Sequence, residues 1–278
     1  MPIGLMYITD RTDVAAVAES VGVDRIFVDM EYIGKDERQA GMDTVKSYHT
    51  IEDVKRIRTV IIKSELMVRV NPINDKNNDF IGSETEINAV ISAGADCIML
   101  PMFKTAEEVE RFVKIINGRA KTVLLIETCE AVENIESILR VEGIDEVHIG
   151  LNDLHLAYGK KFMFELLADN TVEKLLNKIK PYNIPYGFGG IARLGHGMLP
   201  AEYVLSEHYR LGSTRAILSR AFCNINKITD INEIKTLFES EISRIRKYEE
   251  KLAKYTLDDY RKNKEKVKEL VQHIVSHI

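Results

Sequence analysis

Short apolar runs alternate along this chain with segments whose apolar residues recur at helical spacing. The runs are four to six residues long and have the continuous apolar character of strands buried on both faces of a parallel sheet. They lie near residues 3–8, 25–30, 66–70, 97–101, 122–127, 146–150, 184–188 and 215–218. Helix-start signals between them are Thr50 with Asp53, Ser83 with Glu86, and Thr105 with Glu108. The pattern therefore predicts alternating strands and helices.

A weak internal repeat supports parallel strands. The segments GVDRIFVDM, GADCIMLPM and GIDEVHIGL each place Gly-x-Asp, a turn typical of helix ends, directly before an apolar run. Eight strand–helix units over about 220 residues fit an α/β fold of the (β/α)8 type, the TIM barrel, whose usual size is roughly 250 residues. A doubly wound open sheet is the alternative, but no glycine fingerprint follows the first strand. We expect residues 1–225 to form the barrel.

The pattern changes after Phe222. Apolar residues recur at helical spacing at Ile231, Ile234, Phe238, Ile242, Ile245, Tyr248 and Leu252. A second, highly charged segment runs from about residue 257 to the end, and its polar face mixes both signs, which argues against a membrane-surface helix. Residues 226–278 are therefore predicted to form the eighth barrel helix and an extension that packs on a neighbouring subunit of a homo-oligomer.

Composition and charge argue against several classes of partner. The chain is 45% hydrophobic with a net charge of -5, and Lys and Arg are scattered among acids, so no nucleic-acid partner is expected. Apolar runs fall short of membrane-spanning length, and Asp10 and Arg11 come too early for a signal peptide. The three cysteines lack CxxC spacing and are typical buried fillers of a reduced protein. We expect a cytoplasmic protein without a membrane partner.

Charged residues follow several predicted strands at their carboxyl ends, where TIM barrels build their active sites. They are Asp29, Glu31, Arg69, Glu127 and Asp153. Glu127 and Asp153 follow neighbouring strands with little Cys or His nearby, an oxygen-rich set that suits Mg²⁺ or Mn²⁺. The alternative is that each acid only caps the next helix, although Asn152 offers another cap beside Asp153.

Arg69 interrupts the apolar strand LMVRV. Burying a guanidinium is costly unless it meets an anion, and its planar fork matches a substrate carboxylate. An internal ion pair with Glu31 or Asp29 explains the residue equally well. Both interpretations stay open from the sequence.

Five segments in combination resemble the HpcH/HpaI aldolase/citrate lyase family of metal-dependent carbon–carbon lyases. They are FVDME, VRVNP, GADCIMLPMFKTAEEVERF, IETCEAVENIESIL and GIDEVHIGLNDL. The resemblance extends over residues 3–222 and implies a (β/α)8 barrel. It also implies that Glu127 and Asp153 are the metal ligands, and that Arg69 contacts the keto or carboxylate end of the substrate.

The resemblance implies a reaction as well. A divalent ion chelated by the carboxylate and keto oxygen of pyruvate, or of a similar 2-oxo acid, stabilises the enolate formed when a carbon–carbon bond breaks or forms. The backbone after Gly150, at Leu151, Asn152 and Asp153, would hold the 2-oxo-acid carboxylate. The expected activity is aldol cleavage or its reverse, with an aldehyde as the second substrate. Family members commonly exchange the last helix between subunits.

The chain departs from the family pattern in one respect. Pyruvate aldolases of the family carry a His–Asp acid/base dyad, and the corresponding positions here are Tyr32 and Ser92. The segment DMEYIGKDERQ is similar instead to citrate lyase β-subunits. The alternatives are therefore a lyase subunit acting on an acyl-CoA or carrier-bound substrate, or a non-catalytic binding subunit. For an aldolase, the expected proton donor is metal-bound water held by Glu31, with Tyr32, His155 and His196 as reserves.

Two further features have competing interpretations. The segment GFGGIARLGHG adds Arg193 and His196 as substrate-binding candidates, and its glycines suit a phosphate or sugar oxygen, but tight turns explain them equally well. Lys104, after the fourth strand, is the candidate for a Schiff-base aldolase, although lysines at such points are usually solvated. His148 lies within a strand and is expected in the core.

Overall fold

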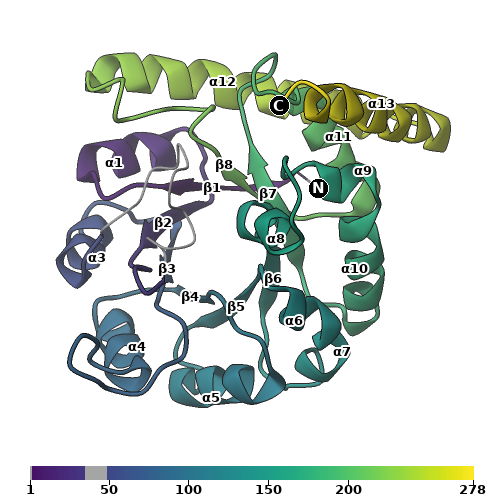
Figure 1. Cartoon of the computed structure of the whole chain (residues 1–278). Coiled ribbons are helices and arrows are strands. Elements are labelled where there is room, and N and C mark those ends of the chain that lie inside the picture. The colour runs from purple at the N-terminus through teal and green to yellow at the C-terminus, as the bar shows by residue number, and fades with distance from the viewer. Residues whose placement is uncertain (1, 35–48) are drawn as a thin grey trace.

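The computed structural model describes residues 2–34 and 49–278. Within these residues, eight parallel strands form a closed barrel in chain order, completed where β1 pairs with β8 (Figure 1). The strands are β1 (Gly4–Ile8), β2 (Arg25–Asp29), β3 (Glu65–Arg69), β4 (Cys97–Leu100), β5 (Lys121–Ile126), β6 (Glu146–Ile149), β7 (Tyr186–Ile191) and β8 (Arg215–Leu218). The predicted TIM barrel is confirmed. The alternative, a doubly wound open sheet, is wrong, because an open sheet would leave its edge strands unpaired, whereas β1 pairs with β8 here.

Helices surround the barrel, as Figure 1 shows. They are α1 (Thr12–Ser20), α3 (Ile51–Arg58), α4 (Ser83–Ser92), α5 (Ala106–Ile116), α6 (Cys129–Glu133), α7 (Ile135–Ile138), α8 (Leu151–Ala157), α9 (Glu165–Ala168), α10 (Thr171–Ile179), the 3-10 helix η1 (Lys180–Tyr182), α11 (Ala201–Leu211), α12 (Ile231–Leu252) and α13 (Leu257–Val275). Each strand therefore leads into a segment that returns outside the barrel, so the carboxyl ends of all strands meet at one rim.

The capping boxes predicted before α3 and α5 are confirmed, but the one before α4 is wrong. Gly82, not Ser83, occupies the N-cap, and no side chain caps that helix start. The hydroxyl of Ser83 accepts the N–H of Asn74 at 2.9 Å, and Glu86 accepts the side-chain amide of Asn71 at 2.7 Å. The two side chains thus hold the loop after β3 instead of forming a box.

The barrel interior has an apolar middle layer. One buried cluster consists of Met6, Phe27, Met67, Cys97, Met99, Val123 and Leu125, all on strands β1 to β5. Because side chains alternate along a strand, the residue two positions beyond an inward-facing residue also faces inward. Asp29, Arg69 and Glu127 stand two positions beyond Phe27, Met67 and Leu125. The strands therefore place these charges above the apolar layer, at the carboxyl rim.

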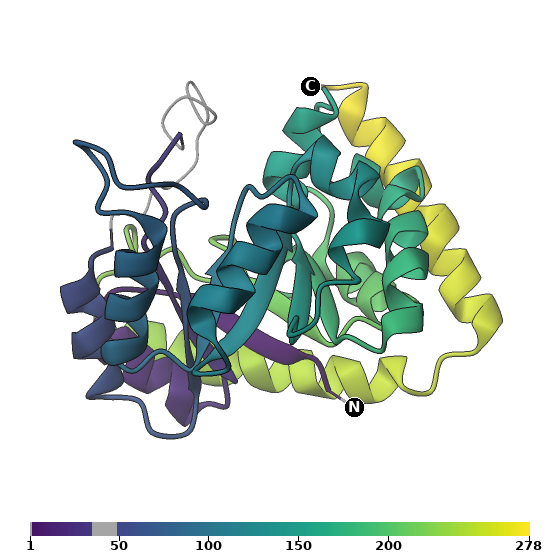
Figure 2. The same ribbon diagram turned by 90° about the horizontal axis from the view of Figure 1, so that it is seen from below.

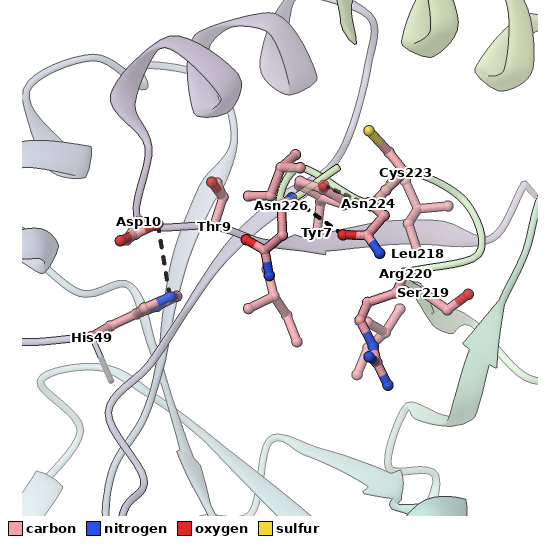
Figure 3. Close-up of a pocket in the computed structure, with 13 residues that line it drawn as sticks. Tyr7, Thr9, Asp10, His49, Leu218, Ser219, Arg220, Cys223, Asn224 and Asn226 are labelled. Atoms are coloured by element: carbon pink, nitrogen blue, oxygen red, sulfur yellow. Dashed lines mark hydrogen bonds and ion pairs between the residues drawn. The ribbon is translucent and has the colours of Figure 1, made fainter. Parts of the chain in front are cut away.

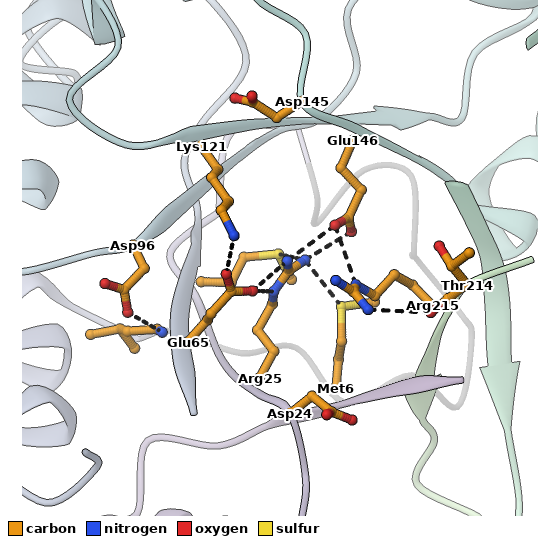
Figure 4. Close-up of polar contacts among 12 residues, drawn as sticks. Met6, Asp24, Arg25, Glu65, Asp96, Lys121, Asp145, Glu146, Thr214 and Arg215 are labelled. Atoms are coloured by element: carbon orange, nitrogen blue, oxygen red, sulfur yellow. Dashed lines mark hydrogen bonds and ion pairs between the residues drawn. The ribbon is translucent and has the colours of Figure 1, made fainter. Parts of the chain in front are cut away.

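A charged network fills the opposite, N-terminal end of the barrel (Figure 4). The buried guanidinium of Arg25 lies 2.8 Å from Glu146 and 2.7 Å from Glu65. Arg215 also contacts Glu146, and Lys121 contacts Glu65. Burial would raise the pKa of Glu65, but hydrogen bonds from Lys121 and Arg25 outweigh it and lower that pKa to about 2. Glu65 therefore stays ionised at neutral pH, and each buried charge of the network has a partner of opposite sign.

Two buried histidines lie beside β7. His148 is in the core, as predicted, with its Nε2 at 3.2 Å from the carbonyl oxygen of Gly189. His208 stacks on Phe188 with 3.8 Å between ring centroids, and its Nδ1 lies 2.8 Å from the hydroxyl of Ser213. Burial lowers the pKa of His148 to about 4 and that of His208 to about 3. Both rings are therefore neutral in the folded protein near pH 7.

We expect the protein to lose stability as the pH falls below 6.5, the ordinary histidine pKa. Between that value and the lowered pKa values, the unfolded chain binds protons that the folded chain does not. The stabilisation is complete above pH 6.5 and falls by roughly 1.4 kcal/mol per histidine for each pH unit below it. Urea unfolding across this range measures the slope. The variant His208→Gln should show a shallower slope and exposed His273→Gln an unchanged one; equal slopes for all three proteins would contradict the assignment.

The two C-terminal helices lie against the barrel of their own chain (Figures 1 and 2). Helix α12 packs on α1 and buries an apolar stripe of Ile234, Phe238, Ile242, Ile245 and Leu252. Helix α13 packs on α9 and α11 and buries Val267 and Val271. The two predicted amphipathic helices are confirmed. The domain boundary at residue 225 and the contact of α13 with a neighbouring subunit stay predictions.

Among the helices of the described residues, none combines the length and the apolar character that crossing a membrane requires.

Candidate active site

An arginine–carboxylate cluster lies at the rim, at the ends of β2 and β3. Arg69 donates from Nε and Nη2 to the two carboxylate oxygens of Asp29, both at 2.8 Å, and its Nη1 lies 3.2 Å from Glu31. Burial alone would lower the pKa of Arg69, but the charges of Asp29, Glu31 and Glu127 outweigh it and raise that pKa well above its usual value. The internal ion pair is thus confirmed, with both acids that the sequence offered, and a role in substrate binding stays a prediction.

The loop that carries Glu31 is held by Asn71 and Glu86, for which the sequence predicted no role at the site. The side-chain oxygen of Asn71 accepts the N–H groups of Tyr32 and Ile33, each at 3.0 Å. Its amide nitrogen donates to buried Glu86 at 2.7 Å. Burial raises the pKa of Glu86, although its bonds from Asn71 oppose the shift. In the sequence, the feature that could have indicated this role is the Asn-Pro pair that follows the third strand.

Glu127 and Asp153 line the same pocket, of about 280 Å³. Glu127 follows β5 and is only 2% exposed, and its Oε1 accepts the N–H of Met102 at 3.1 Å. A Cβ on Gly150 would come within 2.8 Å of the Glu127 Oε2 and 3.0 Å of the Glu127 Cβ, so a larger residue there would displace this carboxylate. Asp153 comes from the first turn of α8. The predicted pair of acids is therefore brought together by two neighbouring strands.

Neither acid is the N-cap residue of the helix that follows it. Thr128 caps α6 by accepting the N–H of Ala131, so that role does not fall to Glu127. Helix α8 has Gly150 at its N-cap, so neither Asn152 nor Asp153 is the N-cap residue. Asp153 does lie in the first turn of α8, where a negative charge is favourable, and its role as a metal ligand stays a prediction.

The donor set fits a hard divalent cation. Glu127 and Asp153 offer carboxylate oxygens in one partly enclosed pocket, and Mg²⁺ is commonly bound by one or two carboxylates together with water and substrate oxygens. In the described part of the chain, no group of three or more His, Cys, Asp or Glu side chains is arranged to hold a metal.

The remaining predicted residues are distributed around the rim. Tyr32 is 45% exposed and its hydroxyl donates to the carbonyl oxygen of Asp79 at 3.2 Å. His155 is buried on α8, with its Nδ1 at 3.1 Å from the carbonyl oxygen of Leu151. His196 is exposed, whereas Arg193 lines a separate hollow beside α12. The catalytic and binding roles of these residues stay predictions.

Ser92 occupies the position that corresponds to the Asp of the family dyad. It is exposed at the last residue of α4, the end from which the chain turns back to the start of β4. Burial and then the charges of Glu86 and Asp79 raise the pKa of the Tyr32 hydroxyl. Residues 35–39 of the citrate-lyase-like segment lie outside the described residues.

Close packing accounts for two glycines of the GFGGIARLGHG segment. A Cβ on Gly187 would lie 2.4 Å from the carbonyl oxygen of Arg215, and one on Gly189, where φ is +51°, would lie 2.7 Å from Leu151. These contacts favour the turn-and-packing interpretation over an anion site. Gly150 donates its own N–H to Ile126, so a carboxylate would be held by the later N–H groups of α8.

Lys104 has the properties of a solvated cation. Its Nζ lies 2.8 Å from Glu130, and the side chain is half-exposed. The hydrogen bond to Glu130 raises the pKa of Lys104. A Schiff-base lysine must lose its proton to act as a nucleophile, so this environment argues against that alternative.

His49, which the sequence did not single out, is joined to the arginine–carboxylate cluster. Its Nδ1 accepts the backbone N–H of Asp29 at 3.0 Å, and its Nε2 lies 3.9 Å from Asp10 (Figure 3). His49 also lines a second pocket on the rim, of about 470 Å³, beside the ends of β1 and β8. The position of this histidine just before the Thr50 cap carries no chemical signal in itself.

Comparisons with known proteins show the family to which the chain belongs. The family model for HpcH/HpaI aldolase/citrate lyase matches residues 3–166. Two similar curated proteins are the 2-keto-3-deoxy-L-rhamnonate aldolases of Salmonella paratyphi B and Salmonella newport, each 25% identical over 187 residues. Those alignments cover 56% of this chain, which spans only 62% of the length of either relative.

Solved structures with the same fold extend over most of the chain. The HpcH/HpaI aldolase of Desulfitobacterium hafniense has a TM-score of 0.61 at 16% identity, and the alignment covers 84% of this chain and 93% of that one. Citrate synthase SbnG has a TM-score of 0.59 at 16% identity, covering 84% and 94%. At this identity the likeness shows the fold alone. Since the family model covers more than half of the sequence, the chain belongs to the HpcH/HpaI aldolase/citrate lyase family.

Proposed function

We propose that this protein is a divalent-metal-dependent lyase that breaks or forms a carbon–carbon bond through the enolate of a 2-oxo acid such as pyruvate. The observation that carries the proposal is the shared pocket of Glu127 and Asp153, with the charge of Glu127 also acting on Arg69. The names of the curated relatives, aldolases of a 2-keto-3-deoxy acid, support the same class of substrate.

Each group at the rim has a defined task in this reaction. Glu127 and Asp153 would hold the ion, and when bound, Mg²⁺ or Mn²⁺ supplies a Lewis acid for the keto oxygen. Arg69 adds a permanent positive charge beside the 2-oxo acid, and Asp29 fixes the plane of its guanidinium through two hydrogen bonds. The N–H groups of the first turn of α8 would donate hydrogen bonds to the carboxylate of the 2-oxo acid.

Cleavage then needs two proton movements. The hydroxyl on the carbon to be released gives up its proton, the carbon–carbon bond breaks, and an aldehyde leaves. The electron pair of the broken bond stays with the 2-oxo acid as its enolate. A proton added to the enolate carbon completes the second product. The low exposure of Glu127 and of the cluster around Arg69 keeps bulk water away from the charge that develops.

Proton exchange on pyruvate tests the proposal without knowledge of the aldehyde. With Mn²⁺ or Mg²⁺ in deuterated water, we expect the methyl protons of pyruvate to be replaced by deuterium, and we expect a chelator to stop the exchange. Proton NMR follows the methyl signal. Exchange that survives the chelator, together with trapping of pyruvate by borohydride, would favour Lys104. Absence of exchange with pyruvate and oxaloacetate alike would favour the carrier-dependent or non-catalytic subunit.

A further inference from the structure

Two exposed histidines lie side by side at the end of α13, the helix that packs on α9 and α11 (Figure 2). They are His273, in the last turn of the helix, and His277, two residues beyond its end. Their ring centroids are 4.3 Å apart, and the ring planes are inclined by 48°. Neither residue belongs to the pocket that Glu127 and Asp153 line.

The spacing of four residues places the two rings on one face of the chain. In an α-helix, residues i and i+4 are neighbours one turn apart. Although α13 ends at Val275, the turn continues, because the N–H of Ser276 donates to Gln272 at 3.1 Å and that of His277 to Ile274 at 3.0 Å. Two histidines at this spacing on one helix face bind the zinc ion of many metalloproteases.

The position of the proton on the His277 ring leaves its other nitrogen suited to a metal. Nδ1 lies 2.7 Å from the carbonyl oxygen of His273, which can only accept, so Nδ1 carries the proton. The hydroxyl of Ser276 donates to the same carbonyl oxygen at 2.7 Å. The lone pair of the neutral ring is therefore on Nε2. Histidines that bind metals commonly donate their other ring N–H to a carbonyl oxygen in this way.

The separation of the two rings suits a single ion. A bond from zinc to a histidine nitrogen is about 2.0–2.1 Å long, so two rings on one tetrahedral ion have centroids about 5 Å apart. The observed separation is 4.3 Å, and rotation of these exposed side chains makes up the difference. Imidazole ligands suit Zn²⁺, Ni²⁺ and Cu²⁺, whereas Mg²⁺ and Mn²⁺ prefer oxygen.

We propose that His273 and His277 chelate one transition-metal ion of the class that prefers imidazole, represented by Zn²⁺ and Ni²⁺. Among the described residues, no group of three or more possible ligands is arranged to hold a metal, so water completes the coordination. The site is separate from the proposed site of the hard cation and does not depend on the proposed function.

The bound ion has a consequence for α13. It joins the last turn of the helix to the residue beyond it, and so holds closed the hydrogen bonds that the N–H groups of Ser276 and His277 make. Helix ends otherwise open readily, because few buried contacts oppose the opening. The ion therefore stabilises the end of α13.

Calorimetry with Ni²⁺ tests the chelate on the full chain without a polyhistidine tag, in excess Mg²⁺ so that sites for hard cations are filled. We expect one Ni²⁺ per chain. His277→Gln should lower the affinity roughly 100-fold, because the second imidazole binds as an intramolecular ligand.

The matched control changes the spacing and keeps the number of histidines. The double variant Gln272→His, His273→Gln has two exposed histidines five residues apart, on different faces of the helix. It should bind Ni²⁺ no better than His277→Gln does. Undiminished affinity in the double variant would overturn the proposal, because the number of histidines and not their spacing would then determine binding.

Hydrogen exchange supplies a second measurement. Ni²⁺ should slow exchange of the backbone amides of residues 276 and 277 in the wild-type protein and leave them unchanged in the double variant. Unchanged exchange in the wild-type protein at saturating Ni²⁺ would overturn the chelate across this turn. Glu127→Gln should bind Ni²⁺ as the wild-type protein does, and a loss of binding in that variant would place the ion at the rim instead.

Discussion

Glu127→Gln should abolish tight Mn²⁺ binding and slow metal-dependent exchange of pyruvate protons by roughly a thousandfold. The amide keeps the shape of the side chain and its contact with Met102, but it removes the negative charge that a hard cation needs. Calorimetry measures the binding, and proton NMR measures the exchange. The expected loss is large because the pocket offers few other carboxylates that face the same point.

Glu130→Gln is the matched control, since Glu130 lines the same pocket but is half-exposed and paired with Lys104. It should bind Mn²⁺ as the wild-type protein does. Undiminished Mn²⁺ affinity in Glu127→Gln would remove this acid from the metal site. An equal loss of Mn²⁺ affinity in Glu130→Gln would instead indicate that the ion lies close to Glu130.

Arg69→Lys should fold but lose activity, with kcat/KM lowered by roughly 100-fold. Lysine keeps the positive charge between Asp29 and Glu31, so the buried acids are not left without a cation. It cannot reproduce the planar fork that binds Asp29 through two bonds and presents a third nitrogen towards Glu31. The substitution keeps the positive charge and removes its fixed orientation.

Steady-state kinetics and the thermal unfolding midpoint, measured together, distinguish the two roles that the sequence left open for Arg69. A fall in kcat/KM with a nearly unchanged midpoint supports substrate contact. A lower midpoint with near-normal kinetics would assign Arg69 to structure alone. Arg111→Lys, which alters an exposed ion pair with Asp75, should change neither quantity.

The barrel was predictable because its strands are short, parallel and buried on both faces. Such strands appear in a sequence as continuous apolar runs, and a charged residue that ends a run, as Asp29 and Arg69 do, is then fixed at the rim. The same reasoning located Glu127 and Asp153 correctly in one pocket. It failed at the start of α4, because the choice of Gly82 as the N-cap depends on a loop that folds back through Asn74.

Contacts between distant segments could not be predicted in this way. Arg25 and Glu146 are 121 residues apart and meet because β2 and β6 face each other across the barrel. His49 accepts the backbone N–H of Asp29, which lies 20 residues before it in the sequence. Arg193 lines a hollow together with residues of α12, so its surroundings depend on how the C-terminal helices pack. Local periodicity holds no information on such pairings.

The charged network at the N-terminal end of the barrel has a consequence for heating. Removing ions from water costs less free energy as the temperature rises, because the ordering of water around charges becomes less favourable, whereas stabilisation by apolar burial levels off. The stabilisation that the ion pairs of Arg25 contribute therefore increases relative to that of the apolar layer of Phe27 and Met67 above them. As the temperature rises, the charged end therefore contributes a larger fraction of the free energy that stabilises the folded barrel.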